Sequence, residues 1–226
     1  MKKNIVLFIM FFISIFSTAY AATIQNPVDM LENSMVSTQD EMVKNTDMYQ
    51  KDPYALLELI NKNIIPIVDE KVIAQLVVSP DKWNKATPEE QKEFIKDATE
   101  MLVFLYAKNV AYAGKYKIAL FPFTDDSWKN KSIVVVNGKV INNTNNQSSD
   151  FSVKLFKKKD GSGWSVYDFN VAGISVVETY KQQFAGYDTV PEMTQAIIKT
   201  TDKMKQKSYP ELLTEEQKNA NDSDSE

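Results

Sequence analysis

The sequence contains no histidine, no cysteine and no arginine, so all 26 of its basic residues are lysine. Without imidazole or thiol groups the chain cannot form a Ser-His-Asp triad, a Cys-His dyad, a zinc site built from His or Cys, or a disulfide. The chemistry that remains is that of carboxylates, lysine, tyrosine and hydroxyls. Because the chain also has no glycine-rich phosphate loop and no metal-ligand spacing, we expect neither a cofactor nor a metal.

The overall composition is that of one soluble domain. Of 226 residues, 43% are hydrophobic and 11% aromatic, which is enough for a single core, and 25% are charged. The net charge of −4 gives no reason to expect a nucleic-acid partner.

The first residues have the pattern of a secretory signal peptide. Lys2 and Lys3 precede an apolar run over 5–16, and Ala19-Tyr20-Ala21 is a small-residue cleavage site. About twelve apolar residues are too few to span ~30 Å of hydrocarbon as a helix. We therefore expect residues 1–21 to be removed and the protein to be exported. The expected domain covers 22–213, and the acidic tail 214–226, which lacks aromatic residues, is expected to be disordered.

Capping signals predict helices in the first half of the mature chain. Asn26 and Asp52 each precede a proline, the arrangement of an N-cap followed by proline at the first helical position. Thr87 and Glu90 form a capping-box pattern at the start of a long helix, which we expect to end near Ala113 with Gly114 in a left-handed conformation.

From Tyr116 the apolar period changes to two, which predicts strands. Asn137-Gly138 predicts a tight turn or bulge inside the second of them. The four expected strands cover 116–123, 132–141, 151–158 and 163–171, and two helices follow over 174–185 and about 190–207. The predicted fold is α+β, with an antiparallel four-stranded sheet packed by N- and C-terminal helices.

Carboxylates are the candidates for catalysis. Asp125 and Asp126 are adjacent and are typical of a solvated turn. Asp168 beside Tyr167 resembles an acid/base pair only if both side chains point into one pocket, and strand alternation favours opposite faces. The apolar surplus of the chain indicates either a filled core or a cavity around a ligand, and the sequence does not distinguish the two.

Two stretches resemble one known family. The first is Ile65-Pro66-Ile67-Val68-Asp69 with Trp83, Ala86-Thr87-Pro88 and Gln91 to Phe94; the second is Gly163 to Phe169, Val171 to Val177 and Tyr180 to Phe184. Together they are similar to the conserved blocks of the MlaC family, periplasmic phospholipid-binding proteins also described as toluene-tolerance proteins. Lys181 stands where that family usually has arginine, so the bidentate fork of a guanidinium is missing there.

The resemblance implies a non-catalytic carrier with an α+β fold whose apolar cavity holds the acyl chains of a phospholipid. It implies two partners, an inner-membrane ABC transporter with an MCE-domain subunit and an outer-membrane lipoprotein–porin complex. Helical face makes Tyr180 and Lys181 the candidates for the mouth of such a cavity.

Helical face and strand period select the residues expected to touch the acyl chains. They are Val72, Leu76, Leu102, Leu105, Tyr106, Val134, Val136, Phe151, Val153, Tyr167, Phe169, Val171, Ile174 and Val177. Two other functions stay open: an exported enzyme that uses Asp168 on an apolar substrate, and an envelope protein that only bridges other proteins.

Overall fold

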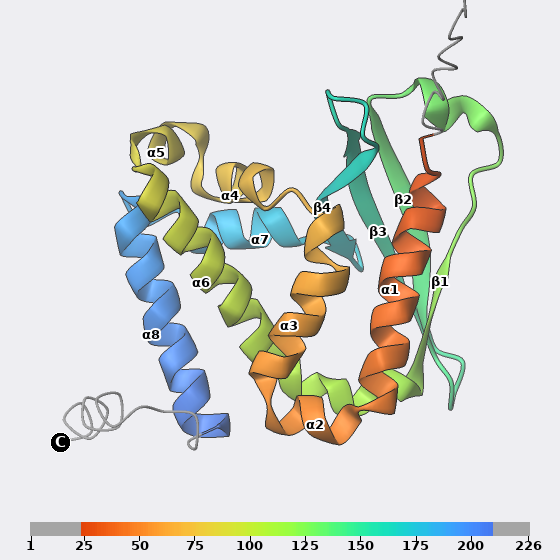
Figure 1. The fold of residues 1–226 in the computed structure, drawn as a ribbon, viewed down its shortest axis with the longest axis horizontal. Helices are drawn as coiled ribbons and strands as arrows, with labels where there is room; N and C mark the ends of the chain where they lie inside the picture. Colours follow the sequence, from red (N-terminus) through yellow and green to blue (C-terminus); the bar gives the residue numbers. More distant parts are fainter. Residues whose placement is uncertain (1–23, 210–226) are drawn as a thin grey trace, which may run out of the picture.

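The computed structural model describes residues 24–209, and the expected signal peptide (1–21) and tail (214–226) lie outside them. The predicted α+β class is confirmed (Figure 1). The helices are α1 (Pro27–Lys44), α2 (Thr46–Lys51), α3 (Pro53–Asn63), α4 (Glu70–Val78), α5 (Pro80–Lys85), α6 (Pro88–Ala107), α7 (Val176–Gln183) and α8 (Val190–Ser208), with 3₁₀ turns η1 (Ile65–Ile67), η2 (Lys108–Lys115) and η3 (Asp126–Asn130).

Side-chain caps start the predicted helices where the sequence indicated. The Asn26 side chain accepts a hydrogen bond from the Val28 amide at 2.9 Å. Asp52 accepts from two amides at the start of α3. The capping box of α6 is present, because the Thr87 amide donates to Glu90 Oε2 at 2.8 Å and the Glu90 amide donates to Thr87 Oγ1 at 3.2 Å.

The end of the long helix differs from the prediction. The α-helical part of α6 stops at Ala107, and the chain continues as the 3₁₀ turn η2. Gly114 lies inside η2 and is not among the residues with positive φ, so the expected left-handed termination is wrong. The long apolar pattern persists because both segments bury apolar side chains, and pattern alone does not separate a 3.6-residue period from a 3-residue one over two turns.

The sheet has five antiparallel strands rather than the four expected, in the order β1-β2-β3-β4-β5. They are β1 (Tyr116–Leu120), β2 (Ile133–Asn142), β3 (Ser148–Lys157), β4 (Trp164–Val171) and β5 (Ile174–Ser175). The additional strand exists because Ala172 and Gly173 take φ values of 51° and 86°, which reverse the chain so that β5 pairs with β4 before α7 begins.

Gly138 does not form a turn; it lets the Phe151 ring lie close to the backbone of β2. It lies within regular β2 pairing, opposite Leu120 on one side and Phe151 on the other. A Cβ atom at this position would lie 2.5 Å from Phe151 Cζ and 2.7 Å from the Ala119 carbonyl oxygen. Glycine is therefore needed because the Phe151 ring covers the strand at this point.

The molecule has a sheet side with one core and a helical side with two, one of which packs α2 and α3 against the end of α6 and η2. On one side, α1 lies across one face of the sheet and packs on inward-facing strand residues (Figure 1). On the other side, α6 and α8 run next to each other, and a second core forms among α4, α5, α6, α7 and α8. Within residues 24–209, no helix combines the length and apolar character that a membrane span requires.

Candidate functional site

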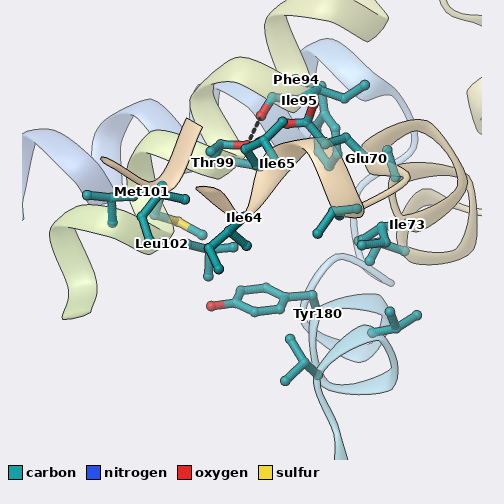
Figure 2. A pocket seen from close by; sticks show the side chains of 18 of the residues that line it. Ile64, Ile65, Glu70, Ile73, Phe94, Ile95, Thr99, Met101, Leu102 and Tyr180 are labelled. Carbon is teal, nitrogen blue, oxygen red and sulfur yellow. Dashed lines mark hydrogen bonds between the residues drawn. The ribbon is translucent and has the colours of Figure 1, made fainter. Parts of the chain in front are cut away.

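An apolar cavity of about 260 Å³, partly open to the surface, lies on the helical side among α3, η1, α4, α6 and α7 (Figure 2). Its wall is made mainly of aliphatic side chains. The lining residues are Ile60, Ile64, Ile65, Val68, Glu70, Ile73, Ala74, Val77, Phe94, Ile95, Ala98, Thr99, Met101, Leu102, Val103, Val176, Val177, Tyr180 and Phe184. In Figure 2 the Tyr180 ring lies across the hollow from Ile64 and Leu102.

Short side chains explain why this space stays open. Ala74 on α4 and Ala98 on α6 face the cavity, and neither reaches far from its helix. Larger residues close one end, where Phe94 and Phe184 pack edge to face with ring centroids 6.0 Å apart. The helices thus meet around positions too small to fill the gap between them.

Strand β4 holds two walls of the cavity in place. The Val166 carbonyl accepts a hydrogen bond from the Asp69 amide at 2.9 Å, and Asp69 in turn caps α4 by accepting from the Val72 amide. Two residues further along β4, Asp168 accepts from the Ser175 hydroxyl at 2.9 Å and from the Val177 amide at 3.2 Å. Both α4 and α7 therefore begin at hydrogen bonds to one strand.

Asp168 is 5% exposed, and its carboxylate is occupied by hydrogen bonds that hold neighbouring parts of the fold together. Lys154 Nζ donates to its Oδ2 at 3.0 Å. Burial alone would raise the pKa of Asp168, but the hydrogen bonds from Lys154, Ser175 and the Val177 amide outweigh it and hold the pKa below its usual value. An ionised carboxylate with these partners is a poor general base, and it anchors α7 to the sheet.

Few polar groups face the cavity. Glu70, at the start of α4, is half-buried, and the Thr99 hydroxyl donates to its Oε1 at 3.3 Å (Figure 2). The Tyr180 ring stacks on Phe184 with centroids 6.3 Å apart. Burial raises the pKa of Tyr180, and the nearby Tyr106 raises it further. Among the described residues that line the cavity, Glu70 is the one that carries a charge.

A second apolar groove, of about 340 Å³, adjoins the cavity. The two share Ile60, Leu102 and Val103 as a common wall. Tyr106 and Val110 extend the groove along the end of α6 and into η2. Apolar surface therefore continues beyond the cavity toward the lower part of α6 in Figure 1.

Four of the expected site residues border these spaces. Leu102 and Val177 line the cavity, as does Tyr180, which was expected at its mouth. Leu102 and Tyr106 line the adjoining groove. Their role in binding stays a prediction.

Most of the expected sheet residues lie in the other core. Val134, Val136, Phe151 and Val153 are buried under α1, and Phe169 packs against them. Tyr167 packs on Phe156 with ring centroids 6.1 Å apart. On β2 and β3 strand alternation identified side chains that point inward, but α1 and two tryptophans fill the space that they face. Tyr167 is not part of this core, because it stands at the register shift between β3 and β4, where alternation is interrupted.

The remaining expected residues lie outside the lining of the cavity. Leu76, Leu105, Val171 and Ile174 are exposed. Val72 is half-buried on α4 and contributes its backbone amide to the helix cap. Lys181, expected at the mouth, is exposed and pairs with Glu178 at 3.6 Å. Among the described residues, the charged residue of the cavity wall is Glu70 of α4, and not Lys181 of α7.

Most of the lining comes from residues that the sequence pattern did not single out. Ile60, Ile64 and Ile65 surround the helix break near Pro66, and Ile73 and Val77 are one turn apart on α4. Three- and four-residue spacing would have identified each as inward-facing. It would not have shown that the helices meet around an open space.

Comparisons with known proteins agree with this geometry. The MlaC protein family matches residues 32–187, more than half of the chain. The chain belongs to the MlaC family. The resemblance indicated by the sequence motifs is thereby confirmed, and the segment matched to MlaC contains all the described residues that line the cavity.

Two relatives are similar over most of their length. The chain is 24% identical over 161 residues to the toluene tolerance protein ttg2D of Pseudomonas putida, a match that covers 71% of this chain and 72% of that protein. A phospholipid-binding protein from Ralstonia solanacearum, solved in complex with a phospholipid, superposes with a TM-score of 0.70 and 23% identity, over 80% of this chain and 99% of that one. At this identity the superposition shows that the MlaC-family chain shares the fold.

Proposed function

We propose that the protein is a non-catalytic phospholipid carrier of the periplasm that encloses acyl chain in the cavity among α3, α4, α6 and α7. The observation that carries this proposal is an apolar cavity of about 260 Å³ in a chain of the MlaC family. Two further facts support it: the Ralstonia solanacearum protein with the same fold was solved with a phospholipid, and the apolar groove continues past Leu102.

The available volume suits an acyl chain. If a methylene group is taken to need about 30 Å³, like a water molecule in the liquid, the cavity and groove together hold roughly 20 methylenes. Burying each methylene is favourable by about 0.8 kcal/mol, so an enclosed chain of that size is on the order of 16 kcal/mol more stable than one in water. A bilayer offers a similar gain, and a carrier that offered much more would not release its lipid.

The partners that we propose follow from the family. They are an inner-membrane ABC transporter with an MCE-domain subunit and an outer-membrane lipoprotein–porin complex. Export by the signal peptide at 1–21 would bring the carrier to the compartment between them.

The test is the lipid content of protein purified without detergent, measured by native mass spectrometry and by organic extraction. We expect phospholipid in the wild type and a severalfold lower content in Ala98→Phe, because the ring occupies the space in front of α6. Ala185→Phe is the matched control, since Ala185 is exposed after α7. Wild-type protein that carries no lipid and takes up none from vesicles would overturn the proposal.

The enzyme alternative receives no support from the geometry. It required Asp168 in a concave pocket, but the carboxylate is buried in hydrogen bonds that anchor α7. The alternative of a bridging protein with a filled interior is disfavoured by the cavity itself.

A further inference from the structure

We propose that Glu70 makes the cavity select phospholipids with a primary amine in the head group, such as phosphatidylethanolamine, over anionic phospholipids such as phosphatidylglycerol. This inference rests on the proposed function. It concerns the head group of the phospholipid, which an apolar wall does not recognise.

Glu70 has the right position for such contact. It lines the cavity, yet it is half-buried and not enclosed, so its carboxylate lies at the border between the apolar interior and solvent. In Figure 2 it lies beside Ile65, Ile95 and Thr99, at the edge formed by η1, α4 and α6. A lipid whose chain fills the cavity from this edge would leave its head group near the carboxylate.

Glu70 also has unused hydrogen-bonding capacity. The single proton of the Thr99 hydroxyl is shared between Glu70 Oε1 at 3.3 Å and the Ile95 carbonyl at 2.9 Å, so at most one hydrogen bond from Thr99 reaches the carboxylate. None of the ion pairs formed within residues 24–209 includes Glu70. A carboxylate accepts about four hydrogen bonds, so an ammonium group can be accommodated without breaking an existing ion pair.

The sign of this charge determines the preference. A primary ammonium donates charge-assisted hydrogen bonds to a carboxylate at about 2.8 Å, whereas an anionic head group offers no cation and is repelled. The lysine expected at the mouth would have favoured the opposite class. Lys181 is exposed and paired with Glu178, so it does not offset Glu70.

The experiment is a competition. Delipidated protein is equilibrated with vesicles of equimolar phosphatidylethanolamine and phosphatidylglycerol with identical acyl chains, and the ratio of the two bound lipids is read by native mass spectrometry. We expect the wild type to favour phosphatidylethanolamine by about threefold to fivefold, the range of a partly exposed ion pair. Glu70→Gln should bring the ratio near one, and Glu70→Lys should invert it.

Glu32→Gln is the matched control, because it removes the same charge from an exposed position on α1, away from the cavity. It should keep the wild-type ratio. Equal ratios in the wild type and Glu70→Gln, or an equal shift in Glu32→Gln, would overturn the role of Glu70 while lipid binding still stands. Absence of lipid from every variant would overturn the proposed function and this inference with it.

Discussion

The sheet side and the helical side of this protein are built from similar apolar residues, yet they differ in how completely those residues fill the interior. Under α1 the strands present Val134, Val136 and Leu155, and Trp128 and Trp164 fill the space between layers. Among α3, α4, α6 and α7, where Ala74 and Ala98 face the gap, a space of about 260 Å³ remains. Apolar content alone therefore does not determine where space for a ligand remains. That depends on the distance between the packed helices and strands and on the size of the side chains that face each other.

The largest expected effect is on the free energy of unfolding, when the same leucine-to-alanine substitution is made on each side. Leu155 is fully buried in the sheet core, so Leu155→Ala should lower the free energy of unfolding by about 3 kcal/mol. Leu102→Ala, beside existing empty space, should cost only about 1 kcal/mol, because fewer neighbours lose contacts. Urea unfolding of delipidated protein measures both.

Lipid binding should show the reverse order. Folded Leu155→Ala should retain the wild-type lipid content, and Leu102→Ala should lose affinity for acyl chains. A larger loss of lipid in the Leu155 variant would show that the sheet side, and not the helical side, holds the ligand.

The next effect concerns Asp168, which joins the two sides. Asp168→Asn removes the charge that accepts from Lys154 and Ser175, and we expect a loss of about 2 kcal/mol of stability at neutral pH together with faster release of lipid. Lys154→Met is the informative second variant, because it removes the cation and leaves the carboxylate in place. It should destabilise the fold in the same direction, as measured by urea unfolding.

The pH dependence of the free energy of unfolding tests the stabilisation that the ionised Asp168 carboxylate provides. Because the folded-state pKa of Asp168 is lowered, its stabilisation is present above the unfolded pKa of about 3.9 and is lost as the pH falls through the folded value. The free energy of unfolding, measured from neutral pH down to about pH 3, should therefore fall less steeply in Asp168→Asn than in the wild type. Parallel profiles would contradict the anchoring role.

The smallest expected effect is at Lys181. Its side chain is exposed and its pair with Glu178 spans 3.6 Å, so Lys181→Gln should change stability by less than about 0.5 kcal/mol. Lipid content should stay at the wild-type level. A marked loss of lipid would place the mouth of the cavity at α7, as we expected from the sequence, and away from Glu70.

Local chemistry made much of the fold predictable. The caps at Asn26, Asp52 and Thr87 depend on residues within four positions, and each helix begins where its cap predicted. The role of Gly138 was harder to predict, because glycine is required there by the Phe151 ring, which comes from another strand. Strand β5 depends on a two-residue turn at Ala172 and Gly173, and its short length leaves no periodic signal.

The candidate site was only partly predictable for a related reason. Periodicity identified Val136 and Leu102 equally well as inward-facing, but it carries no information about what each one faces. Val136 meets a filled core, whereas Leu102 borders the cavity. Glu70 had no periodic signal at all, because its importance comes from the apolar neighbours that η1 and α6 bring to it.

The most direct test of where the lipid lies is photo-crosslinking with a phospholipid that carries a diazirine near the end of one acyl chain. After loading and irradiation, peptide mass spectrometry identifies the labelled residues. We predict label on α3, α4, α6 and α7, at or next to Ile60, Ile73, Ala98 and Leu102. Label concentrated on β2 and β3, around Val136 and Val153, would contradict a binding site on the helical side.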